Sequence, residues 1–213
     1  MITNLRRSLI AILVFTAFFG FVYAFAGTGV AQALFRHEAD GSVTANGSTL
    51  IGQDWSQTSC PGHPLGSCVF QGRPDNLGPY SDVGKYKGDS PVGHPGDNPL
   101  VANGVAGGSG ATNLGPRSQE LLNYTKDLVQ YWRSRGVNPT PDLVTTSGSG
   151  LDPDITPQDA IAEIPMVSGA TGISPSALRN LINQQTHGMQ LGFLGSPYVN
   201  VLQLNEALAK LRT

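Results

Sequence analysis

The residues best suited to chemistry in this 213-residue chain lie in one small glycine-rich loop. Ser147 to Gly150 alternate serine with glycine, and Asp152 and Asp154 follow closely. A glycine-rich loop between a strand and a helix can turn its backbone N–H groups toward a phosphate. Here no lysine follows the glycines, and the two carboxylates would repel an anion. The residues alone therefore favour a structural turn over a nucleotide site.

Other catalytic patterns are absent from the sequence. Ser147 and Ser149 near Asp152 could supply a nucleophile, but no base or oxyanion group can be assigned, and no Gly-x-Ser-x-Gly elbow occurs. The motifs of a P-type phosphorylation site are also missing. We therefore expect a chain that hydrolyses nothing by itself and has no catalytic residue or bound metal. The four histidines are far apart and lack zinc spacing: His37, His63, His94 and His187.

The elements around this loop follow from propensity and capping. Leu143 to Thr146 are β-formers and predict a short strand. Thr156, Pro157 and Asp159 predict an N-cap, a proline at the first helical position and an acidic residue beside the free amides. The stretch Asp142 to Pro157 therefore predicts strand, loop and helix start, with the helix beginning at Pro157.

Three further helices are predicted from apolar spacing. An amphipathic helix between Pro116 and Gly136 carries an aromatic stripe that we expect in the core. A second opens at Ser174-Pro175 and ends near His187-Gly188, and a last one spans Val201 to Leu211. Together with the predicted strand before the glycine-rich loop and the helix after it, these helices predict a single α/β (or α+β) domain.

Composition narrows the class of protein. Charged residues make up only 13% of the chain, the net charge is −2, and the 13 Lys and Arg are scattered, so nucleic acid is not an expected partner. The region 56–116 is a long Gly/Pro-rich loop that contact with other chains could order. Within it Tyr80, Tyr86 and His94 are candidates for such contact, and solvated side chains are an equal alternative.

An apolar segment precedes the domain. The uncharged run Leu9–Phe35 exceeds the ~20 residues that a membrane-spanning helix requires. A cleaved signal peptide is the alternative, since Ala24-Phe25-Ala26 has small-x-small spacing. Composition alone leaves both alternatives open, although the run is long for the apolar core of a signal peptide. Our expected organisation is a cytoplasmic N-terminus (1–7), a transmembrane helix (8–35) and an extracytoplasmic domain (36–213).

Charge gives the expected orientation in the plasma (inner) membrane. Arg6 and Arg7 precede the helix, whereas after Arg36 no Lys or Arg occurs until Arg73. Positively charged flanks remain in the cytoplasm, so the N-terminus is expected there. An exported domain is also where disulfides persist.

Cys60 and Cys68 enclose a short flexible loop and are expected to form a disulfide. The alternative is a metal site made with His63, but this would provide only three ligands at an unusual spacing. Such a short bridge would contribute about 2 to 3 kcal/mol.

The ordered set of motifs resembles the C subunit of the Kdp-type potassium-transporting ATPase. The signature is Ser147, Gly148, Ser149, Gly150, Leu151, Asp152 and Pro153, with Ile155 and Pro157. The matching segments are Gly47–Gln53, Arg73-Pro74, Asn113–Pro116, Leu191–Gly195 and Val199–Asn205. This chain differs from the family pattern in having Glu163 where Gln is usual and Met166 where Arg is usual. Cys60–Cys68 and Gly110–Thr112 look like additions.

The resemblance implies a noncatalytic subunit that stabilises the assembly and promotes ATP use, a role described for the family as a catalytic chaperone. Its implied partners are a channel-like potassium-binding subunit, an ATP-hydrolysing P-type subunit and membrane lipid. ATP and potassium would be handled by the complex. Candidate family-signature residues for nucleotide contact are Ser147 to Pro153 and Glu163. The rival hypothesis is a stand-alone membrane-anchored surface enzyme or binding module, which would be functional without partners.

Overall fold

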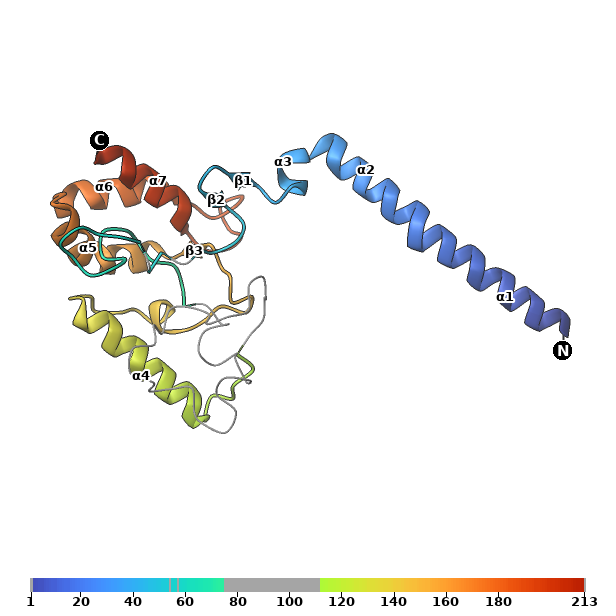
Figure 1. The fold of residues 1–213 in the computed structure, drawn as a ribbon, viewed down its shortest axis with the longest axis horizontal. Coiled ribbons are helices and arrows are strands. Elements are labelled where there is room, and N and C mark those ends of the chain that lie inside the picture. The colour runs from blue at the N-terminus through green and yellow to red at the C-terminus, as the bar shows by residue number, and fades with distance from the viewer. Residues whose placement is uncertain (1, 54, 57, 75–111, 213) are drawn as a thin grey trace. The chain divides into compact units, whose positions relative to one another are not determined.

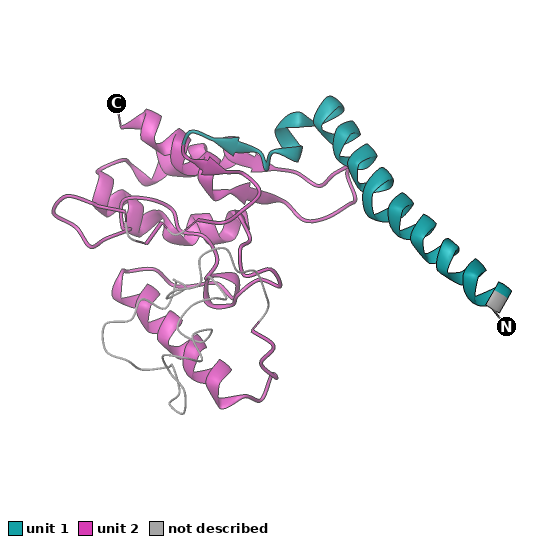
Figure 2. Ribbon diagram, turned by 45° about the vertical axis from the view of Figure 1, so that its right-hand side comes forward, with its two compact units in different colours: residues 1–45 teal, residues 46–213 magenta. Residues whose placement is uncertain are grey.

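The computed structural model describes residues 2–53, 55, 56, 58–74 and 112–212 (Figure 1). The chain divides into two compact units, residues 1–45 and 46–213 (Figure 2). Tyr80, Tyr86 and His94 lie outside the described residues.

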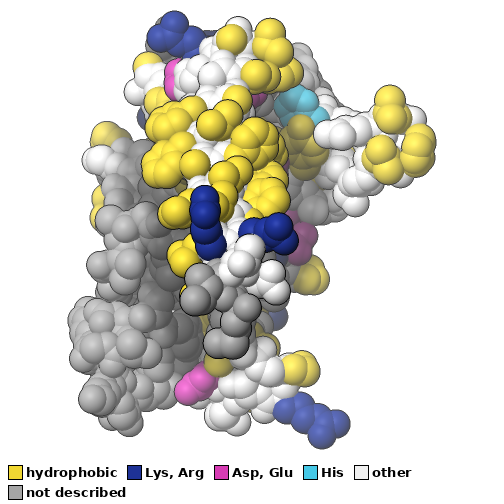
Figure 3. All heavy atoms as spheres, turned by 90° about the vertical axis from the view of Figure 1, so that its right-hand side faces the viewer, with side chains coloured by type: hydrophobic (Ala, Val, Ile, Leu, Met, Phe, Trp, Pro, Cys, Tyr) yellow, Lys and Arg dark blue, Asp and Glu magenta, His cyan; other side chains and the backbone are white. Residues whose placement is uncertain are grey.

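One long apolar helix dominates the first unit. Its helical segments follow one another without a break and make Thr3–Leu34 long and apolar enough to cross a membrane, with 0% of its most apolar window buried. Figure 3 shows hydrophobic side chains gathered along this helix. An unburied helix that is apolar on all sides suits lipid, so the predicted N-terminal transmembrane helix is present. The elements are α1 (Ile2–Ala17), the π-helical segment η1 (Phe18–Tyr23), α2 (Ala24–Leu34), α3 (Arg36–Ala39) and β1 (Val43–Thr44).

The second unit combines helices with a small antiparallel sheet. The sheet has the order β3-β5-β4, in which Asp154 lies opposite Asn200 and Val199 lies between Ile155 and Thr186. With helices packed beside an antiparallel sheet, the domain is α+β. The elements are β2 (Gly47–Ser48), α4 (Gln119–Ser134), the 3₁₀ segment η2 (Asp142–Val144), β3 (Asp154–Ile155), α5 (Pro157–Thr171), α6 (Pro175–Gln185), β4 (Thr186–His187), β5 (Tyr198–Asn200) and α7 (Val201–Leu211).

A single apolar cluster joins these elements. The aromatic stripe of α4 is buried, as predicted, with Tyr124 and Trp132 both in the core. Burial of such large side chains supplies much of the free energy of folding, because it removes apolar surface from water. Other large apolar side chains that are fully buried come from the helices, the sheet and the loops: Phe70, Leu128, Val137, Leu143, Val167, Leu178, Ile182, Val199, Leu204 and Leu208.

The predicted start of α5 is confirmed. Thr156 is the N-cap, its Oγ1 accepts from the Asp159 amide, and the Asp159 carboxylate accepts from the Thr156 amide at 2.8 Å. This capping box satisfies two of the free N–H groups at the start of the helix. Pro157 occupies the first helical position, where its missing N–H costs nothing.

The predicted strand at Leu143–Thr146 is wrong. The chain forms a 3₁₀ turn over Asp142–Val144, with the Val144 amide donating to Pro141 O at 3.2 Å. Consecutive Leu143 and Val144 are both buried, whereas a half-buried strand alternates. The Trp132 indole N–H donates to Leu143 O at 2.8 Å, so a side chain rather than a neighbouring strand satisfies that carbonyl.

The other predicted helices are present with small shifts at their ends. α6 has Ser174 as its N-cap but ends at Gln185, because Thr186 and His187 pair with β5 instead. α4 follows the Ser118 N-cap, and Gly136 then takes a φ of 74°. Among the described residues of the 56–116 region, no helix or strand is formed.

Candidate functional site

The signature loop, Ser147–Pro153, turns its polar groups onto itself. The Gly150 amide donates to Ser147 Oγ at 2.9 Å, and the Leu151 amide donates to Ser149 Oγ at 3.1 Å. Gly150 has a φ of 71°, a conformation that favours glycine. An anion could take these two amides only by displacing the serine hydroxyls. The serines thus act as local acceptors that close the turn.

A second glycine-rich segment lies directly against this loop. The Gly52 amide donates to Leu151 O at 2.8 Å. A Cβ placed on Gly52 would lie only 2.6 Å from Asp152 O, a backbone atom that cannot swing away. Glycine at position 52 is therefore required for the two segments to meet. By contrast, a Cβ on Gly148 would meet nothing within 4 Å.

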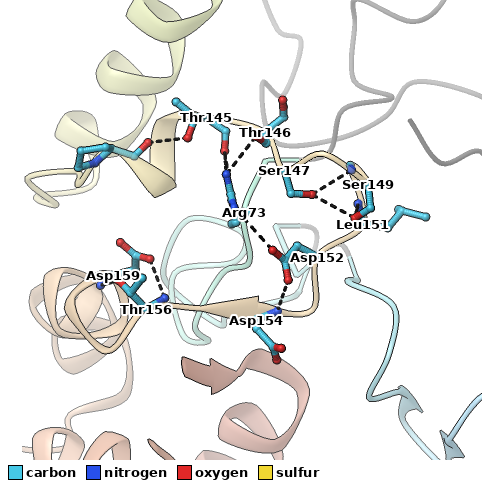
Figure 4. A network of polar contacts seen from close by, with 12 residues as sticks. Arg73, Thr145, Thr146, Ser147, Ser149, Leu151, Asp152, Asp154, Thr156 and Asp159 are labelled. Carbon is cyan, nitrogen blue, oxygen red and sulfur yellow. Dashed lines mark hydrogen bonds and ion pairs between the residues drawn. The ribbon is translucent and has the colours of Figure 1, made fainter. Parts of the chain in front are cut away.

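Arg73 holds the loop from the other direction (Figure 4). Its Nη2 donates to Thr146 O at 3.0 Å, and Nε and Nη2 both reach Thr145 O at 3.4 Å. Nη1 lies 3.6 Å from Asp152 Oδ2, in an ion pair whose side chains are 22% and 33% exposed. The planar guanidinium spreads its donors over three nitrogens, so it reaches separated partners that the single nitrogen of a lysine could not reach together. One residue thus fixes both ends of the loop.

Arg73 belongs to a short segment, Phe70–Arg73, that connects three parts of the domain. At one end the Asn205 side chain on α7 pairs with both backbone groups of Phe70, at 2.8 and 2.9 Å. In the middle the Gln71 amide donates to Glu163 Oε2 on α5 at 2.8 Å. The 70–73 segment therefore ties α7 and α5 to the signature loop.

Glu163 is fully buried, with 0% of its surface exposed. Its Oε1 has no hydrogen-bond partner among the described residues. Burial raises the pKa of Glu163 well above its ordinary value; the Gln71 amide lowers it, and the Asp159 carboxylate one turn earlier raises it further. Because its carboxyl is fully buried, Glu163 offers no ligand at the surface.

The strand that follows the loop is held by Asn200. Its side-chain amide donates to Asp154 Oδ1 and to Thr49 O, both at 2.9 Å, while its Oδ1 caps α7 at Gln203. Burial raises the pKa of the Asp154 carboxyl, and the nearby Asp152 charge raises it further. The hydrogen bond from Asn200 and the nearby His187 lower this pKa, but they do not cancel the effect of burial. Asn200 thereby links the Gly47–Gln53 region, β3 and α7.

Cys60 and Cys68 are joined in a disulfide, with Cα atoms 5.6 Å apart. Both residues are buried, and the Cys68 amide donates to Cys60 Sγ at 3.0 Å. A cysteine pair in a disulfide cannot supply thiolate ligands, so the alternative metal site with His63 does not form in this structure. Among the described residues, no three His, Cys, Asp or Glu side chains are grouped as metal ligands.

The structure brings Ser147–Pro153 together as one closed loop, but it places Glu163 differently. Glu163 contacts Gln71 in the interior rather than any group of the loop itself. Reasoning from the sequence gave Arg73 and Asn205 no role, although both lie in motif segments. The sequence offered one signal for Asn205: it is a polar residue on the apolar face of the last helix, and a buried polar side chain needs a hydrogen-bond partner. For Arg73 the only signal was its place in the Arg73-Pro74 motif.

The chain matches the family described as "K+-transporting ATPase, c chain" over residues 5–210. It is similar to proteins named "Potassium-transporting ATPase KdpC subunit" from three bacteria. It is 37% identical to that of Methylorubrum extorquens, with 99% of this chain and 98% of the relative covered. It is 36% identical to those of Rhodopseudomonas palustris and Sorangium cellulosum, with 98% of this chain and 97% and 98% of the relatives covered.

Proposed function

Since the chain belongs to the family of K+-transporting ATPase c chains, we propose that it is a noncatalytic accessory subunit of an ATP-driven potassium uptake complex. The match over residues 5–210 carries this proposal, because it includes both the apolar helix and the folded domain. The subunit would accompany a channel-like subunit that binds potassium and a P-type subunit that hydrolyses ATP. Its own contribution is to stabilise their assembly.

The proposed effect on ATP use is indirect. The serine hydroxyls of the signature loop accept from the loop's own amides, and Asp152 adds negative charge beside them. Glu163 is buried beneath the 70–73 segment. These groups are poorly suited to hold a triphosphate. By binding one conformation of the pump more tightly, the subunit would raise ATP affinity at a separate site.

The proposed orientation follows from charge. Arg6 and Arg7 precede the apolar helix, and Arg36 is the only Lys or Arg in the sequence from 36 to 72. The N-terminus is then cytoplasmic and the folded domain lies outside, where the Cys60–Cys68 disulfide would persist. A reporter fused after Thr213 should be active only outside the cytoplasm. A cytoplasmic signal would overturn this orientation.

Purification tests the subunit role. The full-length chain, expressed with the other chains of the transporter and extracted in mild detergent, should co-purify with both large membrane subunits. Removing it should lower potassium-stimulated ATP hydrolysis by the remaining chains. A chain that purifies alone and leaves hydrolysis unchanged would contradict the proposal.

Photolabelling tests the indirect mechanism. A photoreactive ATP analogue added to the cytoplasmic side of the intact complex should label only the P-type subunit. Specific labelling of residues 143–163 that ATP competes away would show direct contact and overturn the indirect mechanism, while leaving membership of the complex intact.

A further inference from the structure

The turn Met189–Leu194, here called the apolar turn, exposes hydrophobic side chains to solvent. Leu191 is 83% exposed and Phe193 is 71% exposed, and both exceed every other large hydrophobic side chain described in the 46–213 unit. Met189 and Leu194 are about half exposed, at 48% and 47%. A cluster of exposed apolar side chains on one short turn is typical of a contact surface, whereas isolated exposed hydrophobics are ordinary.

Hydrogen bonds fix the shape of this turn. Gln190 and Leu194 exchange two backbone bonds of 2.9 Å, and the Phe193 amide donates to Gln190 O at 3.2 Å. Leu191 and Gly192 take positive φ values of 53° and 79°, which the closed turn requires. Because the turn satisfies these backbone groups itself, it can enter an apolar environment at little cost. Its side chains are also held in place before contact, which favours tight binding.

The apolar turn could enter either a lipid bilayer or an apolar pocket on a protein, and the absence of charge distinguishes between the two. From Gly188 to Asn205 the sequence contains no Asp, Glu, Lys or Arg. A segment that binds an anionic bilayer surface usually carries basic residues beside its apolar ones, and this one carries none. A charge-free, fixed turn with a leucine and a phenylalanine at its tip instead suits a complementary apolar pocket on a protein.

We propose that the apolar turn inserts into an apolar pocket on another protein chain of the K+-transporting ATPase complex. This rests on the proposed function as a subunit. Phe193 and Leu191 fill the pocket, and Met189 and Leu194 close its edge. The signature loop, by contrast, takes no part in this contact.

Chemical accessibility provides the first test. Phe193→Cys is introduced into the full-length chain, and maleimide labelling is compared between the chain alone and the purified complex. Labelling in the complex should be at least about 10-fold slower. Leu122→Cys on α4, where the leucine is 48% exposed, is the matched control and should label at similar rates in both states. Equal labelling of Phe193→Cys in both states would overturn the proposal.

Crosslinking identifies what covers the turn. A photoreactive amino acid at position 193, irradiated in native membranes, should crosslink to another chain of the complex. Crosslinks to lipid alone would assign the turn to the bilayer and overturn the proposal. Capture of a protein outside the complex would also count against it.

A charge placed in the contact provides the last test. Phe193→Asp should reduce retention of the chain in the purified complex about 10-fold, while the thermal unfolding of the full-length chain stays unchanged. Leu122→Asp should be retained like the unaltered chain. If the unaltered chain co-purifies and Phe193→Asp does so equally, only the docking proposal fails. If the unaltered chain does not co-purify, the subunit role itself fails.

Discussion

The signature loop and the apolar turn have similar backbones, but the first packs against the domain and the second exposes its side chains to solvent. Each is a short turn that uses a glycine at positive φ, Gly150 at 71° and Gly192 at 79°. In the signature loop the serines bond back to local amides, and Arg73 and Gly52 approach it closely. In the apolar turn the backbone is closed, but Leu191 and Phe193 extend into solvent.

If the signature loop contacts no nucleotide, as we propose, its distinctive residues serve the fold rather than a binding site. In the signature loop the loop's own serines accept from the Gly150 and Leu151 amides, and Gly150 has a positive φ, so these residues are explained by closure of the turn. The apolar side chains of the apolar turn are exposed to water, so packing within the domain does not explain them. What a segment leaves unsatisfied is thus a better guide to intermolecular contact than how unusual its sequence is.

The largest effect is expected from crowding the signature loop. Gly52→Val would place a side chain 2.6 Å from Asp152 O, so the two segments must separate. We expect a loss of about 3 kcal/mol in the free energy of unfolding of the full-length chain in detergent. Gly148→Val is the control, since that position is open. Equal losses in both variants would show that close approach does not shape the loop.

The disulfide should have the next largest effect. Replacing Cys60 and Cys68 by alanine removes the cross-link shortly before the 70–73 segment and should cost about 2 to 3 kcal/mol through greater freedom of the unfolded chain. Denaturant unfolding of the full-length chain measures this. Thiol labelling under denaturing, non-reducing conditions provides a separate check, and reaction of both cysteines would show that the bridge is absent in the mature protein.

Glu163 predicts a dependence of stability on pH. The pKa of its carboxyl is raised in the fold above the ordinary 4.5, so the folded protein keeps a proton that the unfolded chain loses as pH rises past that value. Its contribution to stability is therefore present at low pH and is lost as pH rises toward the folded pKa. Glu163→Gln should flatten this part of the profile and be more stable by about 1 to 3 kcal/mol at pH 8.

The control for that profile is Glu120→Gln, which alters an exposed carboxylate on α4. It should leave the slope between pH 5 and 8 unchanged. Because the new amide of Glu163→Gln would place an N–H2 group where Oε1 has no partner, its gain is smaller than removal of a buried charge alone would give. A Glu163→Gln profile parallel to that of the unaltered chain would refute the buried-acid account.

Local signals predicted most of the helices. The Thr156, Pro157 and Asp159 cap is encoded within four residues, and the stripe of α4 repeats at helical spacing, so both could be inferred without tertiary information. The apolar N-terminal helix was equally clear from its length. Such features depend on neighbours in sequence, which the chain displays directly.

The candidate site was less predictable because its partners are distant in sequence. Leu143–Thr146 has strand propensity, yet Trp132 and Arg73 take its carbonyls, and that depends on the fold. The pairing of Asn205 with Phe70 spans 135 positions. Propensity describes a residue's own preference, whereas these contacts decide which preference is realised.

The smallest effects are expected at Arg73, which both donates to the carbonyls of Thr145 and Thr146 and forms an ion pair with Asp152. Arg73→Lys keeps the charge but loses the planar group that reaches Thr145 O, Thr146 O and Asp152 together, so it should cost about 1 kcal/mol. Asp152→Asn removes only the ion pair, because the amide oxygen can still accept from Asp154 N. With both side chains partly exposed, that change should cost about 0.5 kcal/mol or less.

Thermal unfolding of the two single variants and of the double variant gives the coupling between these residues. If Arg73 acts mainly on the carbonyls, the cost of Arg73→Lys persists almost unchanged when Asp152 is already asparagine. A cost that disappears in the Asp152→Asn background would mean that the ion pair holds the loop instead. In that case salt should weaken the loop, because an exposed ion pair is screened while the carbonyl contacts are much less so.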